Sequence, residues 1–320
     1  MANDYSKIKF RYKTQSVYFL KDTQAPDYIT EKIEAEKNFY EIDLLSWLEK
    51  QDIPPGDFVD VGANIGNHSL FFTKIMKRTT WSFEPYSPAF QLLKENLTAN
   101  KLDISRIFQF GLSSTNTKAN IILPDNNNIG AAKVSIDSTS GIVELKRGDE
   151  VLADIQKISL MKVDVEGHEL DVVKGCLNII KKHHPLLLIE CMNAEEYNKI
   201  DTYVEPLGYV PCAVFGATPM IIFKHYNNAP KDMGDAVNEI LHRYFELDGR
   251  FVSARDLHRK YAKELRILRG SNEALRTKNG NLIRYYSKYK AIKSSRSYRI
   301  GLILTLPIRK LKVLAENRRG

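Results

Sequence analysis

Residues 58–66 read Phe-Val-Asp-Val-Gly-Ala-Asn-Ile-Gly, which is an apolar strand followed by a glycine-rich turn. A second apolar strand ends at Glu84, 22 residues after the first glycine of that turn. A strand, a glycine turn and an acid at the end of the next strand are the parts with which a Rossmann-like domain holds a nucleoside cofactor. This feature therefore predicts an α/β fold in which a mostly parallel sheet carries helices on both faces.

The turn differs from one that binds a dinucleotide, which reads G-x-G-x-x-G so that the backbone can approach a pyrophosphate. Here Asn64 takes the place of the middle glycine and Asn67 that of the third, and Asp60 would repel a phosphate. An acid suits a cationic ligand, and S-adenosylmethionine carries a sulfonium, an amino group and a ribose diol but no phosphate. We therefore predict that Asp60 lies near the methionine amino group and that Glu84 holds the ribose hydroxyls. The alternative for Glu84 is a plain surface acid at a strand end. The other predicted donor-binding residues are Gly62, Ala63, Asn64, Gly66, Asn67, Pro85 and Ser113.

Strands and helices alternate along the first 225 residues, which favours a seven-stranded sheet. After the strand before the glycine turn, the expected strands are 80–83, 107–112, 159–165, 185–190, 209–215 and 220–223. The last two are joined by a tight link that predicts an antiparallel hairpin. Helices are expected from about 67 to 76 and from Ser87, with Ser87 as the N-cap. The Gly/Asn/Ser-rich stretch 124–141 is expected to be a loop.

The charge of the chain is concentrated near its C-terminus. Residues 235–320 hold 21 Lys and Arg against 8 Asp and Glu, so the rest of the chain is net acidic although the whole carries +8. We therefore divide the chain into a strand and helix lead-in at 1–50, a donor-binding domain at 51–230 and a basic helical extension at 235–320. The three cysteines form no C-x-x-C pair, and neither a signal peptide nor a membrane span is evident, so we expect a cytoplasmic location.

The extension contains two patterns. Over about 258–292, Leu, Tyr and Asn recur at alternating spacings of three and four, which predicts a homo-oligomeric coiled coil; a solvated helix folded back on the domain is the alternative. Over about 294–314, apolar residues alternate with Arg and Lys, which favours peripheral association with an anionic membrane surface on the cytoplasmic side. Docking on protein is the alternative, and nucleic acid is the least favoured partner because no basic-aromatic groove pattern is present.

Several segments in this order resemble the FkbM family of S-adenosylmethionine-dependent O-methyltransferases, over about residues 35–225. The matching segments are 58–66, Phe83-Glu84-Pro85, Gly111-Leu112-Ser113-Ser114 and Lys162-Val163-Asp164-Val165-Glu166-Gly167-His168-Glu169. The glycine turn alone is common among class I methyltransferases, whereas the D-x-E-G-x-E box is specific. His168 stands where the family more often has a small residue. The resemblance implies a class I, Rossmann-like methyltransferase fold and S-adenosylmethionine as the cofactor.

The catalytic candidates close the strand at 159–165. Asp164 and Glu166 are expected beside the donor's methyl group, where one of them orients or deprotonates the acceptor, with His168 as the alternative base. Two acids at the end of an apolar strand are costly unless they have a partner. The alternative is that Asp164 caps the following helix and Glu166 stays solvated. The box could also hold a divalent cation together with Glu190. Because these positions supply only a few oxygen ligands, we predict no metal.

The favoured function is methyl transfer to a hydroxyl of a carbohydrate, on a surface glycan or a lipid-linked saccharide. A second interpretation is methylation of RNA whose phosphates bind to the basic extension. Against it, the box Asp-Val-Glu-Gly is unlike the Asn/Asp-Pro-Pro-Tyr box of amino-methylating nucleic-acid enzymes. A non-catalytic scaffold whose coiled coil recruits a partner is a third, and the intact set Asp60, Glu84, Asp164 and Glu166 argues against it.

Overall fold

The computed structural model describes residues 5–23, 27–122, 133–136, 140–216 and 218–225. The predicted coiled coil and the predicted amphipathic segment both lie outside these residues. The oligomer and the membrane contact therefore stay predictions. None of the helices in the described part of the chain is both long enough and apolar enough to cross a bilayer.

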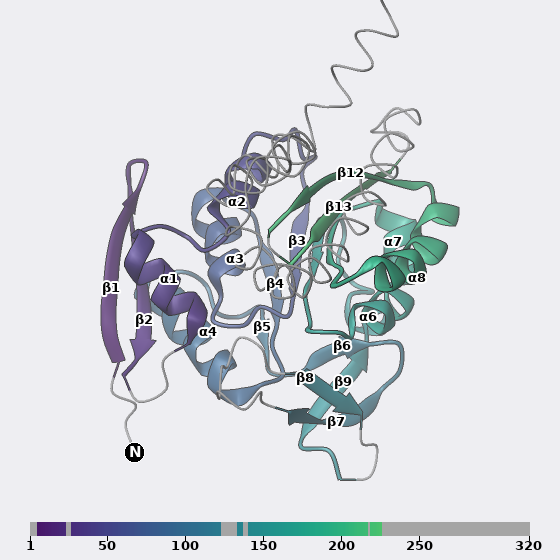
Figure 1. The fold of residues 1–320 in the computed structure, drawn as a ribbon, viewed down its shortest axis with the longest axis horizontal. Coiled ribbons are helices and arrows are strands. Elements are labelled where there is room, and N and C mark those ends of the chain that lie inside the picture. The colour runs from purple at the N-terminus through teal and green to yellow at the C-terminus, as the bar shows by residue number, and fades with distance from the viewer. Residues whose placement is uncertain (1–4, 24–26, 123–132, 137–139, 217, 226–320) are drawn as a thin grey trace, which may run out of the picture. The chain divides into compact units, whose positions relative to one another are not determined.

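A seven-stranded mixed sheet forms the centre of the domain (Figure 1). Its order is β12-β13-β11-β10-β3-β4-β5. The bounds are β3 Asp57–Val61, β4 Thr80–Phe83, β5 Ile107–Phe108, β10 Ile158–Val163, β11 Leu186–Glu190, β12 Tyr209–Phe215 and β13 Met220–His225. The five strands from β5 to β11 pair in parallel, and β13 is antiparallel to both of its neighbours. The predicted mostly parallel sheet with a closing hairpin is confirmed.

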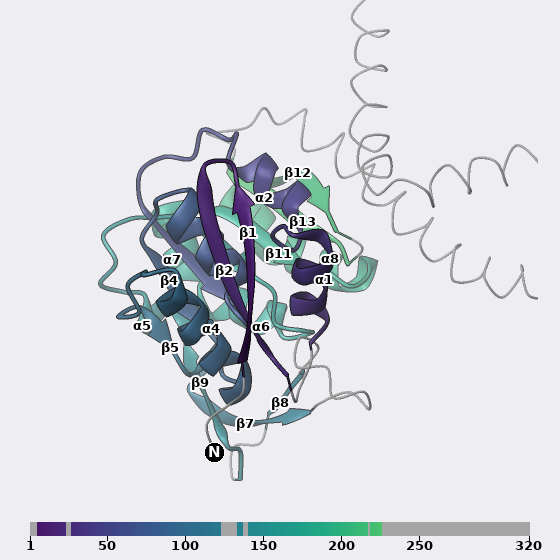
Figure 2. The ribbon, with the colours of Figure 1, turned by 90° about the vertical axis from the view of Figure 1, so that its left-hand side faces the viewer.

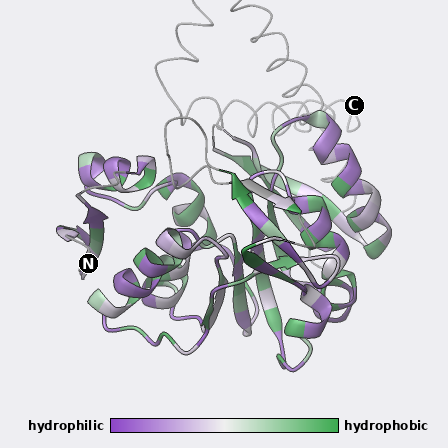
Figure 3. Cartoon of the chain, turned by 90° about the horizontal axis from the view of Figure 1, so that it is seen from below, coloured by the Kyte–Doolittle hydropathy of each residue, from purple (hydrophilic) through white to green (hydrophobic). Residues whose placement is uncertain are grey.

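Helices cover both faces of the sheet, as Figure 1 shows with α3 and α4 on one side and α6, α7 and α8 on the other. Every residue of β10 and β11 is buried, which explains why these strands are mostly apolar and do not alternate between apolar and polar residues. Seen from below in Figure 3, green apolar strands lie in the middle and purple polar positions recur along the outer helices. The helices are α1 Tyr28–Glu36, α2 Ile42–Leu48, α3 Asn67–Leu70, α4 Ser87–Ala99, α5 Gly148–Val151, α6 Glu169–Gly175, α7 Leu177–His183 and α8 Ala194–Val204.

Two details of the expected helices differ from the structure. The helix after the glycine turn begins at Asn67, but it widens into a π-helix over Phe71–Ile75. The N-cap of α4 is Tyr86 rather than Ser87, because the Tyr86 amide is held by the Glu84 carboxylate and Ser87 already has helical backbone. The helix therefore starts directly beside the acid that was predicted to bind the donor.

A second, four-stranded sheet was not predicted. Its order is β6-β9-β7-β8, with bounds β6 Gly111–Ser113, β7 Thr117–Ile122, β8 Lys133–Ile136 and β9 Val143–Arg147. The single strand expected at 107–112 is wrong, because the chain turns after β5 and β6 pairs instead with β9. Part of the expected loop 124–141 is strand β8, which pairs with β7.

The N-terminal hairpin of β1 Tyr5–Tyr12 and β2 Gln15–Asp22 packs against the domain (Figure 2). Two buried asparagines, Asn96 of α4 and Asn100 at the C-cap of that helix, hold the outer edge of β2. The Leu20 amide donates to Asn96 Oδ1 at 2.7 Å, and the Tyr18 amide donates to Asn100 Oδ1 at 3.1 Å. Because these bonds satisfy an exposed strand edge, the lead-in is an integral layer of the domain.

Candidate active site

One cavity of about 270 Å³ opens at the carboxyl ends of β3, β4, β10 and β11. Ligands of open α/β sheets bind at this edge. Its lining includes Gly62, Ala63, Asn64, Asn67, Glu84, Pro85, Asp164, Glu166 and His168, all predicted from the sequence. The lining formed by the described residues does not include Asp60, Gly66 or Ser113. Most of the predicted site residues therefore line one cavity, and these three lie outside its described lining.

The glycine turn can form only with glycine at its first position. Gly62 has φ +76°, and a Cβ there would lie 1.8 Å from the Asp164 carbonyl oxygen. Asn64 also has a positive φ, +49°, and its amide donates to Glu84 Oε2 at 2.8 Å. The turn thus contacts the ends of both neighbouring strands, β10 and β4.

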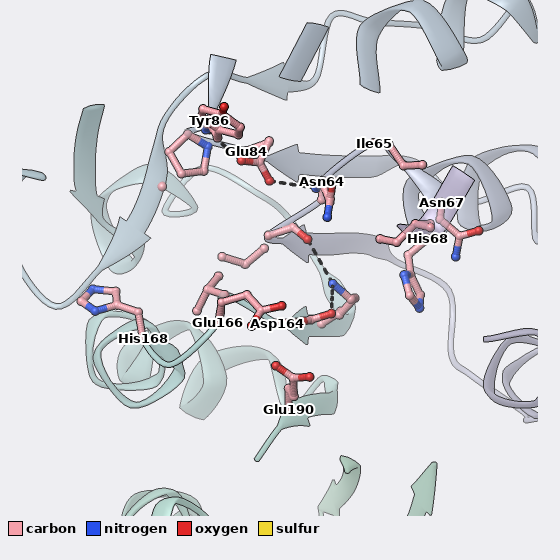
Figure 4. Close-up of a pocket in the computed structure, with 18 of the residues that line it drawn as sticks. Asn64, Ile65, Asn67, His68, Glu84, Tyr86, Asp164, Glu166, His168 and Glu190 are labelled. Carbon is pink, nitrogen blue, oxygen red and sulfur yellow. Dashed lines mark hydrogen bonds and ion pairs between the residues drawn. The ribbon is translucent and has the colours of Figure 1, made fainter. Parts of the chain in front are cut away.

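Glu84 is buried and faces the cavity (Figure 4). Its carboxylate accepts hydrogen bonds from the Asn64 and Tyr86 amides, each at 2.8 Å. Burial raises the pKa of Glu84 to about 7, although the two amides and Lys162 oppose the shift. Each oxygen retains capacity for a further donor, so the side chain can accept bonds from a vicinal diol. The alternative of a plain surface acid is wrong for this residue.

Asp60 is fully buried behind the turn rather than in the cavity wall. It accepts a hydrogen bond from Ser69 Oγ at 2.5 Å and lies 3.4 Å from Lys162 Nζ. Lys162 also lies 3.1 Å from Asp164 Oδ2 and donates to the Gly62 carbonyl at 3.2 Å. The predicted contact of Asp60 with the methionine amino group stays a prediction. What the structure shows for Asp60 is the anchoring of a buried lysine.

Lys162 itself was missed by the sequence reasoning. Burial lowers the pKa of this lysine, but the carboxylates of Asp164 and Asp60 outweigh that effect and hold its pKa above the usual value. A charged ammonium therefore sits between β3 and the end of β10. The available signal was a lysine within the otherwise apolar run Leu-Met-Lys-Val, since a buried charge requires a partner.

Three carboxylates meet on the other wall of the cavity. Asp164 and Glu166 follow β10 and Glu190 ends β11, and one oxygen of each lies within 4.8 Å of the others. Burial raises the pKa of Glu190 well above its usual range, and repulsion from Asp164 and Glu166 adds to the shift. Lys162 in turn holds the pKa of Asp164 below its usual value, against the effect of burial. The alternative in which Asp164 caps the next helix is wrong, because the N-cap of α6 is His168.

His168 lines the cavity, but its ring points away from Asp164 (Figure 4). Its Nε2 lies 3.0 Å from Ser113 Oγ, and its Nδ1 lies 3.6 Å from Asp171 Oδ2. Burial lowers the pKa of this histidine, and Asp171 opposes the shift. Ser113, predicted to bind the donor, contacts His168 in the structure, and its contact with the donor stays a prediction. The proposed role of His168 as a base stays a prediction, and the geometry favours the two acids over it.

A second histidine of the lining was also missed. His68 is buried, and its Nε2 lies 3.3 Å from Glu41 Oε2. Asn67 beside it exchanges two hydrogen bonds of 3.0 Å with the backbone of Tyr40. The segment before α2 is thereby tied to the glycine turn. No local pattern indicates this contact, because its partners lie 27 residues apart.

Comparison with known proteins identifies the family of the chain. The model of the methyltransferase FkbM domain matches residues 60–211. The hexuronic acid methyltransferase AglP of Haloferax volcanii is 32% identical over 140 residues, which are 43% of this chain and 55% of that protein. The methyltransferase sdnD of Sordaria araneosa is 32% identical over 184 residues, with 46% of this chain and 71% of that protein covered.

A solved structure of methyltransferase FkbM from Methylobacillus flagellatus KT shares 20% identity, with 53% of this chain and 43% of that chain covered. Its TM-score is 0.40, so it adds nothing to the assignment of the fold, which rests on the strand order.

Proposed function

Because the chain belongs to the FkbM family of methyltransferases, we propose that it transfers a methyl group from S-adenosylmethionine to a hydroxyl of a carbohydrate. The observation that carries the proposal is the buried Glu84, which faces the cavity and fixes the glycine turn through the Asn64 amide. A cavity walled by carboxylates favours a cationic donor and disfavours a phosphate-bearing one.

The residues of the cavity fit S-adenosylmethionine. Glu84 would hold the ribose hydroxyls, and Asn64 would face the amino group with its Oδ1, a buried atom that has no hydrogen-bond partner among the described residues. Leu112 and the ring of Pro85 offer an apolar wall for the adenine. The ammonium of Lys162 is engaged by two carboxylates and a carbonyl, so it is not offered to a phosphate.

When bound, S-adenosylmethionine supplies an electrophilic methyl group on a sulfonium. Methyl transfer disperses positive charge, so the chief task of the protein is to align the acceptor oxygen and exclude water. Asp164 is held by Lys162, which keeps it a carboxylate able to accept a hydrogen bond from the acceptor hydroxyl. Glu166, beside it on the cavity wall, is the second candidate to take the hydroxyl proton as the oxygen–methyl bond forms.

The choice of a carbohydrate acceptor is supported by the hexuronic acid methyltransferase AglP. The alignment spans little more than half of that relative's length, so the acceptor is a proposal for this chain. No feature of the described residues favours RNA, since the cavity walls are acidic and the basic extension lies outside them.

The test is a transfer assay with methyl-labelled S-adenosylmethionine against uronic acids, neutral saccharides and RNA. We expect label to enter a saccharide, and we expect Glu84→Gln to weaken donor binding measured by calorimetry. Trp81→Phe is a control, because Trp81 lies on the same strand, β4, and packs on Phe108 without lining the described cavity. Transfer to RNA alone, or no binding of the donor to folded protein, would contradict the proposal.

A further inference from the structure

Three acidic side chains meet beside the donor cavity. We call Asp164, Glu166 and Glu190 the acid cluster. Its members come from the ends of two adjacent strands and place one oxygen each within 4.8 Å of the others. Lys162 contacts Asp164 of this cluster and divides its charge with Asp60.

Glu190 provides an observation separate from this clustering. Its side chain is 8% exposed, and its Oε2 is fully buried. When Glu190 is ionised this oxygen has no hydrogen-bond partner among the described residues, whereas the protonated group can share a hydrogen bond with Asp164. Figure 4 shows the carboxylate directed at Asp164, into the cavity that it lines. An ionised carboxylate oxygen buried without a partner is costly, and a bound ion would complete it.

The charge of the whole cavity points to a cation. The described lining holds five acidic side chains and one lysine: Glu41, Glu84, Asp164, Glu166, Glu190 and Lys162. A bound donor adds one net positive charge, from its sulfonium and amino group against its carboxylate. Burial and repulsion from Asp164 and Glu166 favour a proton on Glu190, whereas a cation among the three side chains would let all of them ionise.

We propose that Asp164, Glu166 and Glu190 bind a divalent cation such as Mg²⁺ or Mn²⁺ beside the methyl-transfer position. An all-oxygen ligand set is the type that these hard cations prefer. Three protein ligands leave coordination positions open, where hydroxyl or carboxylate oxygens of the acceptor bind and are oriented. The orientation of the acceptor by the cation rests on the proposed function, whereas the cation site itself does not. The inference departs from the sequence prediction of no metal.

The experiment is a titration of the full chain with Mn²⁺, with free ion followed by electron paramagnetic resonance, in the absence of donor and acceptor. We expect one site in the wild type. Glu190→Gln should weaken it by at least about tenfold, since even the loss of an outer-shell partner typically has that effect on metal affinity. Glu195→Gln is the control, because Glu195 is an exposed acid paired with Lys199 on α8. Equal affinity in Glu190→Gln and wild type, or no bound Mn²⁺, overturns the proposal.

A thermal melt of each variant shows whether it is folded. If Glu190→Gln does not fold, Glu166→Gln replaces it in the Mn²⁺ titration, with the same expected loss of affinity. A separate calorimetric titration with S-adenosylhomocysteine after chelation distinguishes this inference from the proposed function. Product binding without a Glu190-dependent Mn²⁺ site overturns the cation site alone. A Glu190-dependent site without product binding supports the cation site and contradicts the methyl donor.

Discussion

Donor binding should depend on pH through Glu84. The pKa of this buried acid is about 7, so the side chain is about one tenth ionised at pH 6 and about nine tenths ionised at pH 8. A carboxylate accepts hydrogen bonds from both ribose hydroxyls, whereas its protonated form loses acceptor capacity. Because apparent affinity scales with the competent fraction, binding should weaken about tenfold from pH 8 to pH 6, or about 1.4 kcal/mol.

The ligand for this test is 5′-methylthioadenosine, which retains the adenine and the ribose diol but lacks the amino-acid part. Its own charge is constant between pH 6 and pH 8, so calorimetric affinity over that range reports on the protein. Glu84→Gln should bind more weakly and without this pH dependence. The reasoning is refuted if wild-type binding is flat, or if Glu84→Gln keeps the wild-type pH profile.

The same pKa shift makes a prediction about the ligand-free protein. Below the ordinary pKa of 4.5 the side chain is protonated in both folded and unfolded states, so Glu84 has no effect on stability. As pH rises towards 7 only the unfolded state releases the proton freely, so the free energy of unfolding falls. The loss approaches about 3 kcal/mol above pH 7. Between pH 5 and pH 8, urea unfolding should show a smaller decline in Glu84→Gln than in wild type, and the raised pKa of Glu190 accounts for a decline that both proteins share.

Two further substitutions test the supports of the site. Lys162→Met leaves the carboxylate of Asp60 buried beside a single hydroxyl, and we expect it to lower the free energy of unfolding in urea by roughly 3–5 kcal/mol. A loss below about 1 kcal/mol would show that Asp60 does not depend on the lysine. Gly62→Ala places a methyl group against the Asp164 carbonyl, so we expect it to destabilise the protein and weaken donor binding. Gly167→Ala is its control, with a positive φ but open space around the new methyl group, and should incur only a strain of roughly 1–3 kcal/mol. Equal losses in the two alanine variants would contradict the close contact at Gly62.

The sequence by itself determined the central sheet and the position of the cavity. Apolar runs, glycines at positive φ and the interval from the turn to Glu84 are local signals, because they reflect the backbone conformation and burial of one segment. Parallel strands also end at a common edge, so Asp164 and Glu166 could be assigned to the cavity before their distances were known.

Tertiary structure decided what the local signals do not contain. The second sheet exists because β6 and β7 both pair with β9, about 30 residues later in the chain. Lys162 joins Asp60 to Asp164, and Glu190 meets Asp164, only because β3, β10 and β11 are neighbours in the sheet. A strand's own residues do not specify its neighbours, and charge balance depends on which side chains meet. The strand ends could therefore be predicted from the sequence, whereas the buried charge network that they form could not.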